Sequence, residues 1–247
     1  IGNYAFSTSN SETDGGAIYN SGPIGDITGD FIGNYVSSSS RANGGAIFND
    51  GGTIGDITGD FIGNYASGSS AYGGAIYNSG PIGDITGDFI GNYTLGSGSY
   101  ASGGAIFNDG GTIGDITGDF IGNYASGGYS PASGGAIDNS RTIGDITGSF
   151  INNYVSAYSD ALGGAIANTI TSTNPASYPT GSTHSFIGNI TGDFIGNYAL
   201  SSQGIASGGA ILNEESLGRI TGDFVGNYVS GLEGLGGAIA NVRDSDG

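Results

Sequence analysis

Apolar positions recur along this chain in short groups at nearly regular intervals. The motif GGAI begins at Gly15, Gly44, Gly73, Gly103, Gly134, Gly163, Gly208 and Gly236. After GGAI, each unit continues with one variable residue and an asparagine, followed by a turn of three or four residues. A close copy of IGDITGDFIGNY and a serine- and glycine-rich stretch complete it. The pieces GGAIY, IGDIT and FIGNY are rich in isoleucine, phenylalanine, tyrosine and threonine and are separated by glycine, a pattern typical of strands.

Three short strands in each unit predict one coil of a β-solenoid. A single coil cannot bury its own apolar face, so the units must stack, and equivalent residues then form columns about 4.8 Å apart. We therefore predict an all-β parallel β-helix of about eight coils, forming a single domain over residues 1–247. The interval between Gly163 and Gly208 is longer than the others and predicts a loop insertion at 169–186, which includes the only histidine, His184.

Three columns are invariant and apolar, and we expect them to form the core. They are Ile18, Ile47, Ile76, Ile106, Ile137, Ile166, Ile211 and Ile239; Phe31, Phe61, Phe89, Phe120, Phe150, Phe194 and Phe224; and Ile27, Ile57, Ile85, Ile116, Ile146, Ile190 and Ile220. The residue after GGAI varies instead, from Tyr19 and Phe48 to Asp138. Because this position accepts an aspartate, we expect it to face solvent.

Three polar or aromatic columns are predicted to be structural ladders. A stacked asparagine amide can donate to one neighbouring coil and accept from the other, and asparagine tolerates the left-handed backbone of corners. The asparagines are Asn20, Asn49, Asn78, Asn108, Asn139, Asn168, Asn213 and Asn241 after GGAI, and Asn3, Asn34, Asn64, Asn92, Asn123, Asn153, Asn197 and Asn227 in FxxN. The tyrosine column, which includes Tyr35, Tyr65, Tyr93 and Tyr124, is predicted to stack, with a sugar- or surface-binding stripe as the alternative.

Two aspartate columns are the candidate metal ligands. Carboxylates beside glycine-rich turns suit calcium, and stacked carboxylates repel one another unless they are solvated or neutralised by cations. The candidates are Asp26, Asp30, Asp56, Asp60, Asp84, Asp88, Asp115 and Asp119. We expect solvated turn residues, since Ser149 and Arg219 interrupt the columns and GDITGDF lacks the glycine spacing of the calcium-binding nonapeptide, and calcium binding is the alternative.

Composition excludes several functions. With 22 acidic residues, four arginines and no lysine, the net charge of −18 disfavours nucleic acid and anionic lipid as partners. There is no cysteine, and no apolar run is long enough to insert into a membrane as a helix. Carboxylates four residues apart could form a glycosidase pair, but near-copies in seven coils do not make one active site, and His184 has no recognisable nucleophile beside it. We therefore predict no catalytic residues, no enzymatic activity and no cofactor other than the calcium considered above.

The turns between GGAI-x-N and IGDIT alternate SGP, DGGT, SGP, DGGT over the first four units. This second period, which spans two units, indicates that units were duplicated in pairs.

The combination of GGAI and FxxN in each unit resembles the repeats of chlamydial polymorphic outer-membrane proteins and related autotransporter-like surface proteins. Eight GGAI and seven in-register FxxN, such as Phe31-Ile32-Gly33-Asn34, cover essentially the whole chain, whereas an eighth FxxN at Phe186–Asn189 overlaps the IGDIT position. The resemblance implies a right-handed β-helix that is exported to the bacterial surface as a passenger and acts in adhesion. A receptor or glycan on a host or neighbouring cell would be its partner.

This chain is more uniform than that family, so the insertion at 169–186 is the main candidate for a receptor site. We predict a non-enzymatic, extracellular structural protein, the stalk or adhesive passenger of a bacterial cell-surface protein. The alternative is a subunit of a self-assembling filament whose coils stack end to end, because the chain starts within FIGNY and stops before an IGDIT segment.

Overall fold

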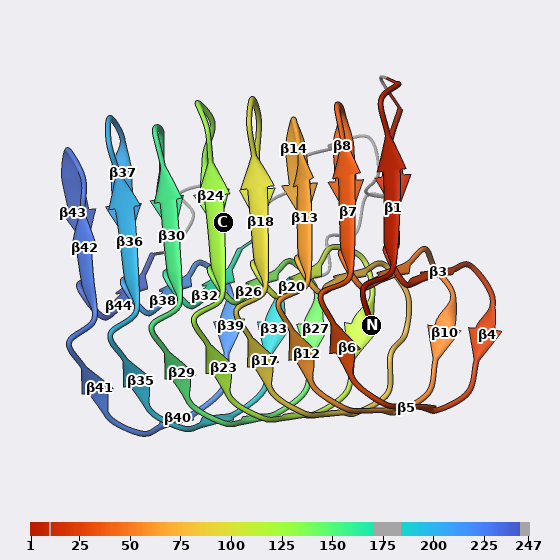
Figure 1. The fold of residues 1–247 in the computed structure, drawn as a ribbon. Coiled ribbons are helices and arrows are strands. Elements are labelled where there is room, and N and C mark those ends of the chain that lie inside the picture. Colours follow the sequence, from red (N-terminus) through yellow and green to blue (C-terminus); the bar gives the residue numbers. More distant parts are fainter. Residues whose placement is uncertain (10, 170–183, 243–247) are drawn as a thin grey trace.

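The computed structural model describes residues 1–9, 11–169 and 184–242. All the regular elements in these ranges are β-strands, and they wind into a β-solenoid of about seven turns with about 30 residues in each turn. Figure 1 shows equivalent strands of successive turns standing side by side along the axis. The predicted all-β solenoid of stacked repeats is therefore confirmed.

Most complete coils contain six short strands, twice the number of apolar pieces in the sequence, and the third coil has five because Ile82 makes only single bridges. In the second coil they are β7 (Tyr35–Ser38), β8 (Arg41–Asn43), β9 (Ile47–Asn49), β10 (Thr53–Ile54), β11 (Ile57–Thr58) and β12 (Phe61–Ile62). Glycine corners divide the IGDIT and FIGNY pieces, and the serine- and glycine-rich stretch contributes a strand of its own, β8.

Equivalent strands form six stacks, which we name sheets A to F. Sheet A contains β1 (Tyr4–Ser7), β7, β13 (Tyr65–Gly68), β18 (Tyr93–Gly96), β24 (Tyr124–Gly127), β30 (Tyr154–Ala157), β36 (Tyr198–Ser201) and β42 (Tyr228–Ser230). Sheet B contains β2 (Thr13–Asp14), β8, β14 (Ser70–Tyr72), β19 (Ala101–Ser102), β25 (Ala132–Ser133), β31 (Ala161–Leu162), β37 (Ile205–Ser207) and β43 (Glu233–Leu235). Sheet C contains β3 (Ile18–Asn20), β9, β15 (Ile76–Asn78), β20 (Ile106–Asn108), β26 (Ile137–Asn139), β32 (Ile166–Asn168), β38 (Ile211–Asn213) and β44 (Ile239–Asn241).

The other three sheets complete the coil. Sheet D contains β4 (Pro23–Ile24), β10, β21 (Thr112–Ile113), β27 (Thr142–Ile143), β33 (Phe186–Ile187) and β39 (Ser216–Leu217), with single bridges through Ile82 between β10 and β21. Sheet E contains β5 (Ile27–Thr28), β11, β16 (Ile85–Thr86), β22 (Ile116–Thr117), β28 (Ile146–Thr147), β34 (Ile190–Thr191) and β40 (Ile220–Thr221). Sheet F contains β6 (Phe31–Ile32), β12, β17 (Phe89–Ile90), β23 (Phe120–Ile121), β29 (Phe150–Ile151), β35 (Phe194–Ile195) and β41 (Phe224–Val225).

Strands pair in parallel with their counterparts in adjacent coils, except that β10 and β21 are linked through single bridges of Ile82, and the register mostly places like residues opposite one another. Phe89 pairs with Phe120 in sheet F and Tyr93 with Tyr124 in sheet A. The eighth FxxN follows the same register, because Ile187 pairs with Ile143 in sheet D. This segment therefore takes the IGDIT position, as the sequence predicts.

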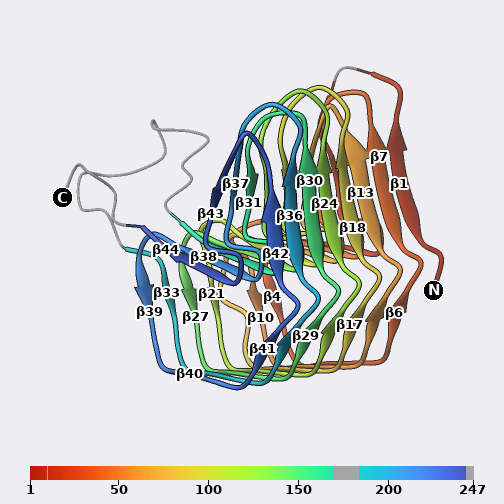
Figure 2. The same cartoon turned by 90° about the vertical axis from the view of Figure 1, so that its left-hand side faces the viewer.

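The cross-section has two parts, which Figure 2 shows from the end of the molecule. Sheets C, D, E and F enclose a body, and sheets A and B rise from it as a flange of two sheets joined by turns at its crest. The serine- and glycine-rich stretch that closes each unit forms the crest of the flange and the strands of sheet B, which were not predicted from the sequence.

The body is filled by stacked isoleucine and phenylalanine. The three predicted columns are buried in the inner coils, and the phenylalanine rings stack with centroids 4.7–4.8 Å apart. A fourth column from sheet D, which the sequence prediction missed, completes the core. It consists of Ile24, Ile54, Ile82, Ile113, Ile143, Ile187 and Leu217.

The flange is held together by small apolar residues. Val36 and Ala66 of sheet A pack against Ala42 and Ala71 of sheet B, and all four are fully buried. Alanine and valine continue this packing in the later coils. Because these side chains are short, the two sheets approach closely and the flange is thin.

The prediction that the residue after GGAI faces solvent is wrong for the inner coils. This column lies on the outer face of sheet C, where sheet B packs over it, and Phe48, Tyr77 and Phe107 form a buried aromatic cluster with Tyr72 of sheet B. Asp138 occupies the same column and is fully buried. The aspartate is thus accommodated inside the protein beside sheet B.

Two glycine positions are required for different reasons. A Cβ on Gly74, the second glycine of its GGAI, would lie 2.0 Å from the carbonyl oxygen of Gly104, so the backbones of adjacent coils approach too closely for any side chain. Gly63 has a φ of +60° but open space where a Cβ would be. Asn152 occupies the equivalent corner with a φ of 55°, in agreement with the tolerance of asparagine for this conformation.

The predicted insertion at 169–186 falls mainly on residues 170–183, which lie outside the described residues. The chain resumes in register at β33.

Candidate functional site

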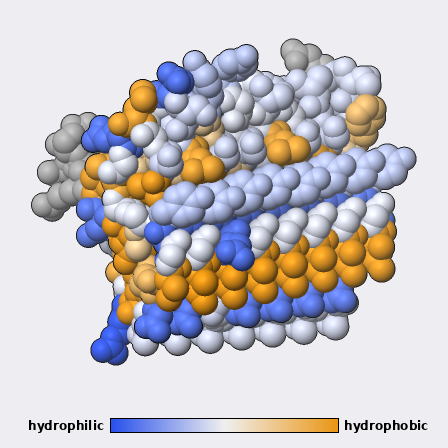
Figure 3. Space-filling model, turned by 60° about the vertical axis from the view of Figure 1, so that its left-hand side comes forward, coloured by the Kyte–Doolittle hydropathy of each residue, from blue (hydrophilic) through white to orange (hydrophobic). Residues whose placement is uncertain are grey.

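One side of the protein carries parallel stripes of like side chains. Figure 3 shows a pale-blue row along the length of the molecule, followed by white, orange and blue rows. This order matches the chain order from sheet A back through sheet F, in which Tyr35 is preceded by Gly33, Ile32 and Asp30. The isoleucine row is partly exposed, 37% for Ile195 and 54% for Val225 at its end, and it was not among the columns singled out from the sequence.

The aspartate columns are hydrogen-bonded ladders. Oδ1 of Asp56 accepts the backbone N–H of Asp84 at 2.9 Å, and Oδ1 of Asp60 accepts the N–H of Asp88 at 2.9 Å. The same bond links Asp26 to Asp56, Asp84 to Asp115 and Asp115 to Asp145 in one column, and Asp30 to Asp60 and Asp88 to Asp119 in the other. Each carboxylate therefore satisfies a backbone donor of the next coil, a role that was not predicted from the sequence.

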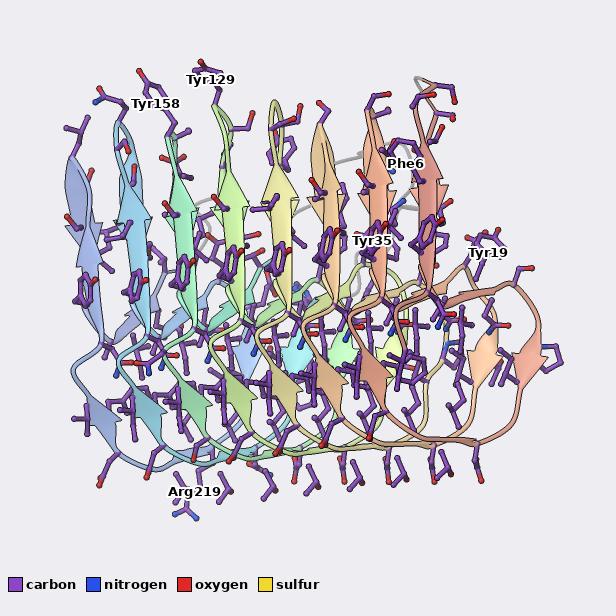
Figure 4. The ribbon with its side chains drawn as sticks, in the orientation of Figure 1. Phe6, Tyr19, Tyr35, Tyr129, Tyr158 and Arg219 are labelled. Atoms are coloured by element: carbon purple, nitrogen blue, oxygen red, sulfur yellow. The ribbon has the colours of Figure 1, made fainter. Side chains whose placement is uncertain are left out.

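The interruptions of these columns preserve the ladders. Asp119 accepts the N–H of Ser149, and the Oγ of Ser149 accepts the N–H of Asp193 at 3.3 Å. Asp145 likewise accepts from Asn189, whose Oδ1 accepts the N–H of Arg219 at 3.1 Å. Figure 4 shows Arg219 projecting away from the body at the position where the first column would carry its next carboxylate.

The structure leaves the calcium prediction untested. In the described ranges, no group of three or more histidine, cysteine, aspartate or glutamate residues is arranged to hold a metal ion. The eight candidates instead form two separate lines along the body, the Asp26 line exposed and the Asp30 line half-buried in the inner coils. Calcium would therefore need ligands from one line together with water.

The asparagines of FxxN form the most completely bonded ladder. Oδ1 of Asn92 accepts both the backbone N–H and the side-chain amide of Asn64, each at 2.9 Å. Its Nδ2 donates to Oδ1 of Asn123 at 3.0 Å and to the carbonyl of Phe61 at 2.8 Å. The pattern also includes Asn34 and continues through Asn153 and Asn197.

A second asparagine ladder runs along sheet C. Asn49 donates through Nδ2 to Oδ1 of Asn78, and Asn78 donates in turn to Asn108 at 3.0 Å. Asn20 starts this ladder, and its Oδ1 also accepts the N–H of Gly22 in the following turn. The asparagines thus join neighbouring coils and fix the corner that follows sheet C.

The tyrosine column of sheet A is a continuous stack, which we name the Tyr ladder. It consists of Tyr4, Tyr35, Tyr65, Tyr93, Tyr124, Tyr154, Tyr198 and Tyr228, with neighbouring ring centroids 4.8–5.2 Å apart and planes 1–13° apart. Each inner ring covers the faces of its neighbours, so a sugar could reach the ring edges but not the faces. Burial against sheet A raises the pKa of several of these phenols, that of Tyr124 to about 12.

The alternation of SGP and DGGT turns has a structural explanation. Tyr77 of an SGP coil donates its hydroxyl to Asp109 of the next, DGGT coil at 2.8 Å, and Tyr19 donates to Asp50 at 2.7 Å in the same way. The DGGT coils carry phenylalanine at the tyrosine position, as in Phe48. Two successive coils therefore form one complementary pair.

Asp138 is the one described carboxylate that is fully buried. Ser133 donates a hydrogen bond to its Oδ2, whereas Oδ1 has no partner. Burial raises the pKa of this carboxyl group to about 6. The group therefore changes charge within a mildly acidic range.

Two of the basic groups, Arg41 and His184, make local contacts. Arg41 lies 3.4 Å from Glu12 and its guanidinium lies over the ring of Tyr72 at 5.3 Å. His184 contacts Glu215 at 2.9 Å through Nδ1. Both are surface pairs, and no described contact of either one involves a nucleophile.

Comparison with known proteins finds no matching family model, no matching curated protein and no matching solved structure. No helix that could cross a membrane is found in the described part of the chain.

Proposed function

We propose that this protein is a non-enzymatic structural repeat, the rigid stalk or adhesive passenger of a bacterial cell-surface protein. The observation that supports this most strongly is the continuity of the side-chain ladders. Asparagine, aspartate, phenylalanine and tyrosine columns each join one coil to the next through nearly the whole described length. The side-chain bonding is therefore concentrated along the axis, as expected for a part that holds two ends at a fixed distance.

The extracellular location and adhesive role rest on the resemblance of the GGAI and FxxN repeats to bacterial surface proteins. The acidic surface adds support, because a net charge of −18 keeps a protein soluble and hinders aggregation with its own copies. A receptor or glycan on a host or neighbouring cell is the partner of the adhesive form, and the described columns need no cofactor to stack.

Mechanical unfolding of the chain by its two ends tests the proposed role. We expect stepwise lengthening by about 100 Å, because a coil of about 30 residues extends to about 3.3–3.6 Å per residue when released. A variant with Asn92→Ala should open at lower force, since its ladder is broken, whereas Asn3→Ala at the first coil should match the wild type. Smooth lengthening without steps would exclude a load-bearing stalk.

Adhesion is tested separately with beads coated with the chain. Binding to bacterial or host cells that survives high salt would support the adhesive passenger, whereas unbound beads with stepwise unfolding would leave the stalk alone. Labelling of intact cells with an antibody against the chain tests the surface location, and labelling seen only after lysis would exclude it.

The filament alternative has one favourable observation. The first and last described coils carry the same residues in the same columns, for example Tyr4 and Tyr228 or Phe31 and Phe224, so the register of one copy could continue in another. Sedimentation and negative-stain imaging decide between the two forms. Uniform rods of about 34 Å, which is about seven turns at 4.8 Å, would exclude polymerisation.

A further inference from the structure

The Tyr ladder brings eight phenol side chains together on one accessible side of the molecule. Neighbouring rings are nearly parallel, with centroids 4.8–5.2 Å apart, so equivalent ring carbons are separated by about the same distance. Tyr4 and Tyr228 are 64% and 46% exposed, and the six tyrosines between them are half-buried. Figure 4 shows the stacked rings along sheet A, with Tyr35 labelled.

The composition makes tyrosine the most readily oxidised side chain of this protein. The 247 residues include no cysteine, methionine or tryptophan, and 15 tyrosines. Cysteine and methionine are the side chains that oxidants usually attack first. An oxidant that reaches this chain therefore acts on phenols, and more than half of them belong to the ladder.

We propose that the Tyr ladder is a site of oxidative phenol coupling, at which tyrosines of neighbouring coils become joined as dityrosine. The reaction needs a one-electron oxidant, and the class we name is a haem peroxidase with hydrogen peroxide. The proposal is independent of the location and adhesive role argued above.

The chemistry balances with this oxidant. Each of two phenols loses one electron and the proton of its hydroxyl group, which leaves two phenoxyl radicals. The radicals combine through one Cε of each ring, and the hydrogen on each of these carbons then moves to the phenol oxygen. One C–C bond forms, two hydrogen atoms are lost in total, and one hydrogen peroxide is reduced to two molecules of water.

The ladder differs from the other tyrosine contacts in the protein. Tyr19 and Tyr77 have their hydroxyl groups bonded to carboxylates. Tyr129 and Tyr158, at the crest of the flange in Figure 4, meet edge to face at 63° with centroids 5.7 Å apart. Among the described residues, only the ladder offers parallel tyrosine rings in register, with no hydrogen bond to the phenol oxygens, so that a radical always has a neighbour along the column.

Coupling there would join tyrosines of consecutive coils and would staple those coils together. Phenols are protonated at neutral pH, and burial raises the pKa of Tyr65, Tyr93 and Tyr124 further, so each ring loses its proton to water as the electron leaves.

Two variants with the same number of substitutions test the proposal in the full chain. The alternating variant carries Tyr35→Phe, Tyr93→Phe, Tyr154→Phe and Tyr228→Phe, so that no two remaining ladder tyrosines are neighbours. The block variant carries Tyr4→Phe, Tyr35→Phe, Tyr65→Phe and Tyr93→Phe, and keeps three of the seven neighbouring pairs. Phenylalanine preserves the stacking in both, and circular dichroism checks that both fold.

Dilute protein is treated with peroxidase and hydrogen peroxide, and dityrosine is measured by fluorescence and mapped by mass spectrometry after cleavage at aspartate. We expect cross-links between neighbouring ladder tyrosines in the wild type. The yield of these ladder cross-links should fall in the block variant in proportion to the neighbouring pairs that remain, and it should fall at least tenfold in the alternating variant. Equal yields in the two variants would overturn the proposal, because contiguity would then not matter. Cross-links confined to other tyrosines, or no coupling under conditions that couple free N-acetyltyrosine amide, would also overturn it.

Discussion

Substitution of Asn92 by alanine should be one of the most damaging single changes in the molecule. Its amide makes four hydrogen bonds, two as acceptor from Asn64 and two as donor to Asn123 and Phe61, and the residue is fully buried. Without it, the backbone N–H of Asn64 is left inside the protein with no acceptor.

The expected loss follows from these bonds. One orphaned buried donor costs about 1–3 kcal/mol, and three further bonds contribute about 0.5–1 kcal/mol each, so the free energy of unfolding should fall by about 4 kcal/mol. That is a large part of the stability of an ordinary domain, which is about 5–15 kcal/mol.

Urea unfolding followed by far-ultraviolet circular dichroism measures this change. Asn3→Ala is the matched control, because the Asn3 side chain only donates to Asn34 and lies exposed at the first coil. We expect the control to lose about 0.5 kcal/mol. If Asn92→Ala lost less than about 1 kcal/mol, and so resembled the control, the ladder could not be a main source of stability.

Three further predictions concern a buried carboxyl group, two glycines and an exposed carboxylate. Asp138 has a pKa near 6 in the folded chain against an ordinary 3.8, so its contribution to the free energy of unfolding is complete below about pH 4 and is lost as the pH rises through 6. Between about pH 4 and pH 7.5 the wild type should lose about 3 kcal/mol of stability that Asp138→Asn does not lose. Urea unfolding of both proteins at these two pH values measures the difference. Gly74→Ala should lower the free energy of unfolding by about 3 kcal/mol or more, because its Cβ would overlap the backbone of the next coil. Gly63→Asn should change the melting temperature little, as Asn152 at the equivalent corner indicates. Similar melting temperatures for the two variants would contradict the close approach at Gly74. Asp56→Asn keeps the acceptor for the N–H of Asp84 and removes one charge of its column, so the melting temperature should rise at low salt and not at high salt, while Asp56→Ala should lower it. A rise of the wild-type melting temperature in millimolar calcium that is smaller in Asp56→Asn would support cation binding. No response to calcium would assign these carboxylates to the ladder alone.

The sequence predicts the parts of the fold in which one residue type is required in every coil. The repeated GGAI and FxxN place isoleucine, phenylalanine and asparagine in columns, since a stacked coil must present the same side chain to the coils above and below. The fourth core column, which contains Ile54, was predictable from the first isoleucine of IGDIT, although it was assigned no role from the sequence.

The flange was not predictable from the same reasoning. Its inner positions accept Val36, Ala66 and Thr94 in turn, because any small side chain fits between sheets A and B. Serine and glycine around them suppress the strand pattern. Because the flange was not predicted, nothing in the sequence showed that sheet B covers Asp138.

The ladder role of the aspartates depends on atoms that a sequence does not locate. The repeats show the columns of Asp26 and Asp30, and they also show that the stacked carboxylates of each column repel one another. Only the folded structure shows that one oxygen of each carboxylate faces the N–H of the next coil. An asparagine or a serine at these positions therefore continues the ladder, which explains why Asn189 and Ser149 are accepted.

The contact between Tyr77 and Asp109 also restricts how the rod can change in length. If recombination removed a single DGGT coil, two tyrosine-bearing coils would become neighbours and one hydroxyl group would lose its carboxylate. Gain or loss of a whole SGP–DGGT pair leaves every such contact intact. Over the first four coils, then, a change in length that keeps tyrosine-bearing and aspartate-bearing coils alternating comes in increments of two coils, about 9.6 Å at a time.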